Sequence, residues 1–218
     1  MKRIIKCFLI ALLIVIILIA AIAIRNMLIL KKLLSLSNSV NKNNYHLITT
    51  IDSPDSKTIF DAYYKNGNSF EKREAQMKSG EQSGNVLTSY YYKKDGEVVV
   101  FYEDGTIGKI SDSENDTSII FTIDNSNMLK NIYLADSSVF YRARLLFTPI
   151  TKDTYDENDV YVFVVGKGKL YVDAETGLTL HYVFDKDESN TFLNYEYDFS
   201  DIDDSIFDYE NSDNLKKE

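Results

Sequence analysis

The hydrophobic pattern divides the chain into an apolar segment near its start and a long series of alternating, strand-like segments. Residues 7–24 read CFLIALLIVIILIAAIAI, eighteen positions without a charge, a proline or a glycine. A helix of this length spans a bilayer core of about 30 Å and exceeds most apolar regions of secretory signals. We therefore expect a transmembrane helix here. Residues 27–40 place leucines at helical spacing, which predicts an amphipathic helix leading out of the membrane.

Beyond this second helix the pattern changes to the period of two that is typical of strands. Asn66-Gly67 is the strongest short hairpin signal, and Lys94-Asp95-Gly96 and Asp104-Gly105 mark two further turns. Residues 111–118 are predicted as a loop and residues 125–141 as a short helix. The predicted strands read YHLITTID, KTIFDAYY, SFEKREAQMKS, VLTSYYYKK, EVVVFYED, TIGKIS, SIIFTID, RARLLFTPI, DVYVFVV, KLYVD, LTLHYVF and TFLNYEYDF.

Runs of antiparallel strands with helices to one side predict an α+β fold. We expect one strongly curved antiparallel sheet with helices on its concave face, preceded by the N-terminal transmembrane helix. Three parts follow from this order. A signal-anchor with its flanks occupies residues 1–32, an extracytoplasmic domain residues 33–208, and a flexible polar tail residues 209–218.

Acidic residues are confined to the part of the chain beyond the apolar helix. None of the 33 Asp and Glu residues lies before Leu33, whereas six of the 24 Lys and Arg residues do. The basic residues on either side of the apolar run are equal in number. The signal-like start and the acidic C-terminal part therefore favour a cytoplasmic N-terminus and an extracytoplasmic C-terminal domain in the cell membrane. The acidic excess also argues against nucleic-acid binding, which relies on Lys and Arg to neutralise phosphates.

Two features bear on export. Ala21-Ile22-Ala23 fits the small-x-small rule for signal peptidase, but the apolar run continues through Ile24. An uncleaved anchor is therefore predicted, with cleavage as the alternative. Cys7, the only cysteine, precedes the apolar run, whereas lipid modification requires a cysteine after it. The extracytoplasmic part consequently forms no disulfide and no thiolate metal site.

The segment GKLYVDAETGLTLHYVF, residues 168–184, has two alternating arms around the letters D-A-E-T-G. This pattern predicts a tight corner in which Gly177 takes the left-handed backbone conformation and Asp173 accepts hydrogen bonds from turn amides. A catalytic Asp173 or Glu175 is the alternative. It is less favoured because no base or nucleophile stands near these carboxylates in the sequence.

The same segment, followed by LNYEYDFSDIDDSIFD, resembles the C-terminal half of the superfamily of LolA-like lipoprotein carriers and RseB-like envelope sensors, which includes membrane-anchored proteins of Gram-positive bacteria. The matching positions are Tyr171, Asp173, Thr176, Gly177, Leu178, Tyr195, Tyr197, Phe199 and Phe207. The resemblance implies a half-barrel of about eleven strands closed by helices. It also implies an apolar concavity that receives an acyl chain or a lipoprotein's lipid anchor.

Inward-facing residues of the later strands are predicted to form the wall of this cavity, although the alternate faces of the same strands fit the sequence equally well. The predicted ligand-binding residues are Leu145, Phe147, Leu170, Val172, Leu180 and Tyr182. The first hypothesis is thus a membrane-anchored protein that binds a lipid or lipoprotein. The second is an envelope sensor or scaffold with a filled core that binds a protein partner. No cofactor is predicted, and an enzyme is the least favoured class because no catalytic constellation is visible.

The most specific pattern for a metal site in the sequence is that of a calcium loop. In DKDESNTFLNYE, Asp185, Asp187, Ser189 and Glu196 fall at the first, third, fifth and twelfth positions of such a loop. Asn190 stands where glycine is expected, and both flanks read as strands rather than helices. An ordinary acidic hairpin is therefore predicted. The two histidines lie on separate predicted strands without metal-site spacing, so no metal site is predicted.

Overall fold

The chain divides into two compact units, each assembled from segments far apart in the sequence. The computed structural model describes residues 2–80, 83–94, 97–102, 107–110, 121–134, 139–186 and 189–208. One unit contains Met1–Ser39 and Met128–Leu178, and the other contains Val40–Asn127 and Thr179–Glu218. We refer to them as the helical unit and the sheet unit.

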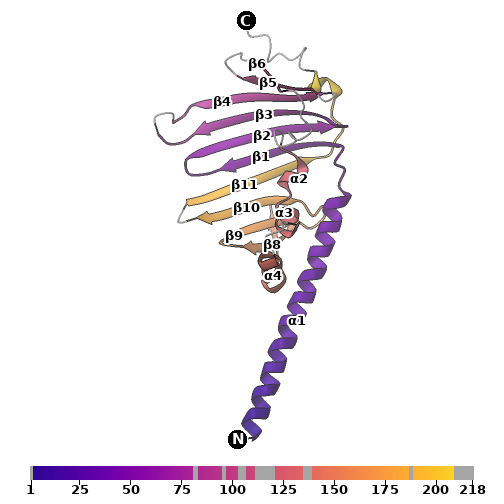
Figure 1. Ribbon diagram of the computed structural model, residues 1–218, viewed down its shortest axis with the longest axis vertical. Coiled ribbons are helices and arrows are strands. Elements are labelled where there is room, and N and C mark those ends of the chain that lie inside the picture. Colours follow the sequence, from indigo (N-terminus) through magenta and orange to yellow (C-terminus); the bar gives the residue numbers. More distant parts are fainter. Residues whose placement is uncertain are drawn as a thin grey trace. The chain divides into compact units, whose positions relative to one another are not determined.

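In the helical unit, α1 (Lys2–Ser39) is one continuous helix (Figure 1), so the predicted transmembrane and amphipathic helices are joined. The apolar part of α1 is long enough to cross a membrane, and none of it is buried. Leu30 and Leu33, further along the helix, are buried. The other elements of this unit are α3 (Met128–Leu134), α4 (Val139–Phe147), β7 (Thr151–Tyr155), β8 (Asn158–Val165) and β9 (Gly168–Asp173). The strands pair antiparallel in the order β9-β8-β7.

The sheet unit contains eight of the eleven strands in the described part of the chain, all paired antiparallel in the order β6-β5-β4-β3-β2-β1-β11-β10. Its elements are β1 (Asn44–Asp52), β2 (Ser56–Lys65), β3 (Asn68–Met77), β4 (Val86–Lys94), β5 (Glu97–Tyr102), β6 (Ile107–Ile110), α2 (Ile123–Ser126), β10 (Thr179–Lys186), β11 (Ser189–Asp198) and the 3-10 helix η1 (Asp204–Phe207). The α+β class and the antiparallel sheet after a long apolar helix are confirmed, and the number of described strands agrees with the resemblance.

The two faces of this sheet are buried by different parts of the chain. On one face, Tyr45, Leu47 and Thr49 of β1 are buried, and Tyr197 and Tyr195 of β11 lie opposite Leu47 and Thr49 in the register. We call this the α2 face, because α2 is hydrogen-bonded to tyrosines on it. The other face is covered at β3, β4 and β5 by η1. The core there consists of Phe70, Tyr92, Val99, Phe101, Ile202 and Phe207.

Two tyrosines, the buried Tyr45 and the half-buried Tyr197, hold α2 on its face of the sheet. The Ile123 amide donates a hydrogen bond to Tyr45 Oη at 3.2 Å, and Tyr197 Oη lies 2.9 Å from Ser126 Oγ. Burial raises the pKa of Tyr45 to about 12 and raises the pKa of Tyr197 still further. Both phenols therefore stay neutral at physiological pH, when each can accept and donate a hydrogen bond.

The corner after β9 forms as the sequence predicts. Asp173 Oδ1 accepts a hydrogen bond from the Glu175 amide at 2.9 Å, and Asp173 Oδ2 accepts one from Thr176 Oγ1 at 2.8 Å. Gly177 has a φ of +70°, the left-handed conformation that a residue without a Cβ adopts at little cost. The carboxylate is thus occupied in closing the turn. Asn66-Gly67 likewise forms the predicted hairpin turn, with φ values of 52° and 92°.

The strand predicted over residues 142–150 is wrong, because α4 continues to Phe147. Pro149 follows two residues later, where proline commonly stands after a helix that it cannot continue. The strand begins only at Thr151, in a segment without apolar alternation whose partner is β8. Leu145 and Phe147 therefore lie on a helix and not on a strand.

Of the predicted strand SIIFTID, residues 118–120 lie outside the described residues, and its last two residues, Ile123 and Asp124, belong to α2. The helix predicted over residues 125–141 is replaced by parts of three helices, α2, α3 and α4. Several predictions fall on positions outside the described residues. These are the loop at 111–118, the tail at 209–218 and the glycines of the turns at 95–96 and 104–105.

Candidate functional site

A buried asparagine in α1 joins this helix to α4. Asn26 is fully buried, and its Nδ2 donates hydrogen bonds to the carbonyl oxygens of Leu146 at 2.8 Å and Thr148 at 2.7 Å. The Leu145 carbonyl lies at 3.4 Å. The last carbonyls of a helix have no partner within the helix, so the Asn26 amide caps α4 from outside. This cap holds α1, which also lines the pocket described next, against the end of α4.

We expect Asn26→Leu to lower the free energy of unfolding by about 2 kcal/mol, because partly buried carbonyls at the end of α4 lose their donor. Asn26→Asp keeps the size of the side chain but removes the N–H groups, and should be at least as destabilising. Thermal unfolding of the full chain in detergent, followed by circular dichroism, measures both changes. Unchanged stability in Asn26→Asp would contradict a donor role.

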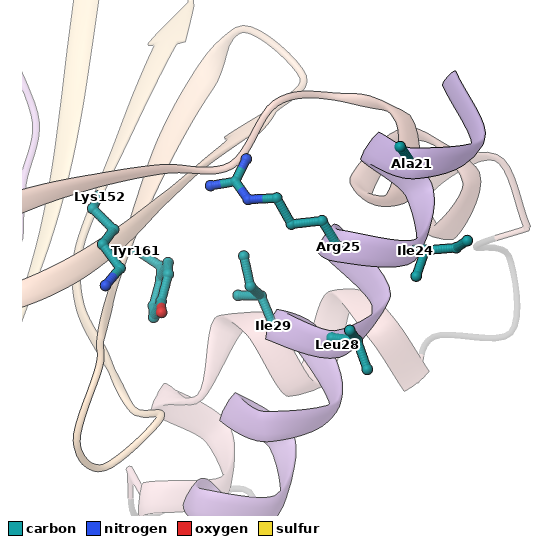
Figure 2. Close-up of a pocket in the computed structure, with 7 residues that line it drawn as sticks. All are labelled: Ala21, Ile24, Arg25, Leu28, Ile29, Lys152 and Tyr161. Atoms are coloured by element: carbon teal, nitrogen blue, oxygen red, sulfur yellow. The ribbon is translucent and has the colours of Figure 1, made fainter. Parts of the chain in front are cut away.

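An open pocket of about 600 Å³ lies beside the capped region, within the helical unit. Figure 2 shows α1 forming one side, with Lys152 of β7 and Tyr161 of β8 on the other. Lys152 and Tyr161 are paired across the two strands, so they lie on the same face of the sheet. The lining residues are Ala21, Ile24, Arg25, Leu28, Ile29, Lys152 and Tyr161. We call this the α1–β8 pocket.

The α1–β8 pocket is apolar except for two cations and a phenol. Arg25 Nη2 donates a hydrogen bond to the Ile150 carbonyl at 3.2 Å, which places the guanidinium across the gap between α1 and the start of β7. Lys152 Nζ lies 5.5 Å from the centroid of the Tyr161 ring, within the range of a cation–π contact. None of the seven lining residues is acidic. The site therefore combines an apolar surface with positive charge.

The six predicted cavity residues do not line the α1–β8 pocket. Leu145, Leu170 and Val172 are almost completely buried and belong to the core of the helical unit. Phe147 is 55% exposed at the end of α4. Leu180 and Tyr182, in the sheet unit, are half-buried on the same face of the sheet as Leu193 and Tyr195 of β11.

Sequence reasoning missed the residues that form the α1–β8 pocket. Arg25 is the first charged residue after the apolar run, and this position predicts only the flank of a membrane segment. Lys152 lies in β7, and the sequence of this strand has no apolar alternation from which a strand could be predicted. Tyr161 was visible in a predicted strand, but nothing in the sequence indicates that α1 lies across its ring.

A second unusual site is a buried carboxylate in the sheet unit. Glu71 of β3 is fully buried, and its Oε2 accepts a hydrogen bond from the Phe121 amide at 2.5 Å. Its Oε1 lies 2.7 Å from Arg73 Nη2, and the Arg73 guanidinium stacks over the rings of Phe60 and Tyr91. Burial raises the pKa of Glu71, although the Phe121 amide and Arg73 partly offset the shift. Both oxygens are engaged in holding the segment that leads into α2, which indicates a structural role.

The two histidines each contact a side chain on a neighbouring strand. His46 Nε2 lies 2.6 Å from Asp61 Oδ1, and its ring stacks on Tyr63. His181 Nδ1 lies 2.5 Å from Asn194 Oδ1, and burial lowers the pKa of His181. Among the described residues, no group of three His, Cys, Asp or Glu side chains is placed to hold a metal ion.

The acidic hairpin predicted in place of a calcium loop is confirmed. β10 and β11 pair directly across it, with Asp185 opposite Asn190 and Lys186 opposite Ser189. The turn itself, residues 187–188, lies outside the described residues. Paired strands keep the flanks extended, whereas a calcium loop of this type joins two helices.

No protein-family model matches the chain, and a search of curated proteins finds no match. Among solved structures, it is similar to LprF from Mycobacterium bovis, at 14% identity and a TM-score of 0.42, over 77% of this chain and 91% of that one. It is also similar to a DUF1329 family protein from Desulfovibrio piger ATCC 29098, at 9% identity and a TM-score of 0.30, over 84% and 97% of the two chains. A third similar structure is the Pseudomonas aeruginosa MucA/MucB complex, at 10% identity and a TM-score of 0.40, over 82% of this chain and 60% of that one. At these TM-scores, the function has to be argued from the pocket and the charges of the chain itself.

Proposed function

We propose that this chain is a membrane-anchored, extracytoplasmic binding protein that holds the acyl chain of a lipid or lipoprotein in the α1–β8 pocket. The observation that carries the proposal is the pocket's size and lining. It measures about 600 Å³, and four aliphatic side chains and the Tyr161 ring line it beside two cations. Ligand sites in proteins typically have 300–1,000 Å³ and a mainly apolar wall with a few polar groups.

The position of the pocket along α1 supports the same proposal. Ala21 and Ile24 belong to the exposed apolar run, and Arg25 is the first charged residue after it. If the run crosses a bilayer, its end and the pocket lie at the membrane surface. An acyl chain then reaches the pocket without crossing water. Each buried CH₂ group contributes about 0.8 kcal/mol before the costs of association.

A protein-binding sensor or scaffold is the second candidate function. It is favoured by the burial of residues predicted to line a cavity, since Leu145, Leu170 and Val172 belong to the buried hydrophobic core. A partner would then be recognised at a surface of the chain, and no small ligand would be required.

Native mass spectrometry of the full chain, released gently from bacterial membranes, distinguishes the two functions. We expect an adduct of lipid mass that Leu28→Gln reduces about tenfold, because the amide would be buried against the acyl chain. Met27→Gln is the matched control, since Met27 is an exposed neighbour on α1 that does not line the pocket. A folded protein that carries no lipid adduct would contradict acyl binding and favour the protein-binding function.

A further inference from the structure

The helical unit differs sharply in charge from the rest of the chain. Residues 1–39 and 128–178 contain twelve Lys and Arg and seven Asp and Glu, whereas the remaining residues contain twelve Lys and Arg and 26 Asp and Glu. Lys2, Arg3 and Lys6 precede the apolar run, and the part of the unit that follows it, residues 25–39 and 128–178, still contains nine Lys and Arg against seven Asp and Glu in a chain with a net charge of −9. Positive charge beside a membrane segment attracts anionic lipid headgroups, by about 1 kcal/mol for each Lys or Arg near the surface.

Two of these cations line the α1–β8 pocket from opposite sides, Arg25 on α1 and Lys152 on β7 (Figure 2). Arg25 uses Nη2 to bond the Ile150 carbonyl, and a guanidinium carries five N–H groups in all. Lys152 Nζ is held near the Tyr161 ring, which does not neutralise its charge. Donors therefore remain at both residues for an acceptor with several oxygens, such as a phosphate.

On this basis we infer that the α1–β8 pocket selects phospholipids with an anionic headgroup, taken from the membrane leaflet in which the apolar run of α1 ends. The inference rests on the proposed acyl-binding function and specifies its ligand. One acyl chain lies along Ala21, Ile24, Leu28 and Ile29, while the phosphate lies between Arg25 and Lys152. The lipid anchor of a lipoprotein carries acyl groups but no phosphate, so it would leave both cations without an anion.

The test uses the full chain in nanodiscs made of phosphatidylcholine with an equal amount of phosphatidylglycerol. Native mass spectrometry after release from the nanodisc counts the lipids of each kind that stay bound. We expect phosphatidylglycerol to be enriched about tenfold or more over phosphatidylcholine. Arg25→Gln and Lys152→Gln should each reduce this enrichment about fivefold, as one cation per headgroup predicts.

Lys31→Gln with Lys32→Gln is the matched control. Both lysines are exposed on α1 and lie outside the pocket lining, so the enrichment should remain. Equal retention of the two lipids, unaffected by Arg25→Gln and Lys152→Gln, would overturn the headgroup inference and leave acyl binding intact. A loss of enrichment in the lysine control as large as in the pocket variants would indicate general surface attraction and also overturn it. Retention of neither lipid would overturn the proposed function itself.

Discussion

Gly177→Ala is expected to lower the free energy of unfolding of the full chain by about 3–5 kcal/mol, in the range of the most damaging single substitutions. Gly177 has a φ of +70°, where a residue with a Cβ is strained by about 1–2 kcal/mol. A Cβ on Gly177 would also collide with the backbone carbonyl of Leu33 and approach the Ser37 amide to 3.0 Å. These atoms belong to α1 and cannot move aside like the end of a flexible side chain.

Gly166→Ala separates the two causes. Gly166 has a φ of +63°, but a Cβ there would meet no atom within 4 Å. We expect Gly166→Ala to cost only the conformational strain of about 1–2 kcal/mol. Denaturant unfolding in detergent, followed by tyrosine fluorescence and circular dichroism, measures both variants. Equal losses in the two variants would contradict the close approach of the Gly177 turn to α1.

The Gly177 turn shows which contacts can be predicted from the sequence and which cannot. The letters D-A-E-T-G predict its conformation and the hydrogen bonds of Asp173, because these depend on residues within a few positions of one another. The contact with Leu33 joins residues more than 140 positions apart. No local pattern encodes such a contact. The lack of space for a Cβ at Gly177 is therefore seen only in the structure.

The strands with regular alternation were predicted well, and the segments shaped by distant partners were not. β1 and β9 follow an apolar period of two, and β8 is a continuous apolar run, whereas β7 is a strand because β8 pairs with it. Alternation also identifies which residues share a face, but not what covers that face. This is why the sequence places Leu170 and Val172 together on one face, while only the structure shows that both are completely buried.

The candidate site was missed for a related reason. The residues around Arg25 look like the flank of a membrane helix, and a helix read alone gives no indication that Lys152 and Tyr161 lie across from it. Five of the seven lining residues come from α1 and two from strands more than 120 positions away. The pocket depends on that packing, which Asn26 helps to fix through the end of α4.

The second large effect is expected at the buried carboxylate of the sheet unit. Glu71→Ala should lower the free energy of unfolding by about 3 kcal/mol, because the Phe121 amide and the Arg73 guanidinium both lose their acceptor. It should also increase hydrogen exchange at the amides of residues 121–127, since Glu71 holds the start of this segment. Glu74→Gln is the control on the same strand. Glu74 is 36% exposed and pairs with Lys72, and such surface pairs contribute little.

Glu71→Gln isolates the charge of this residue from its hydrogen bonds, and the result depends on pH. Burial raises the pKa of Glu71 above its ordinary value of 4.5, so the folded chain holds this proton more tightly than the unfolded chain does. The Glu71 contribution to stability is therefore fully present below pH 4.5 and is lost as the pH rises toward the folded-state pKa. Across that window, Glu71→Gln should gain stability relative to the unsubstituted chain, as measured by denaturant unfolding at each pH. The opposite slope would mean that the ion pair with Arg73 outweighs the burial of the carboxylate.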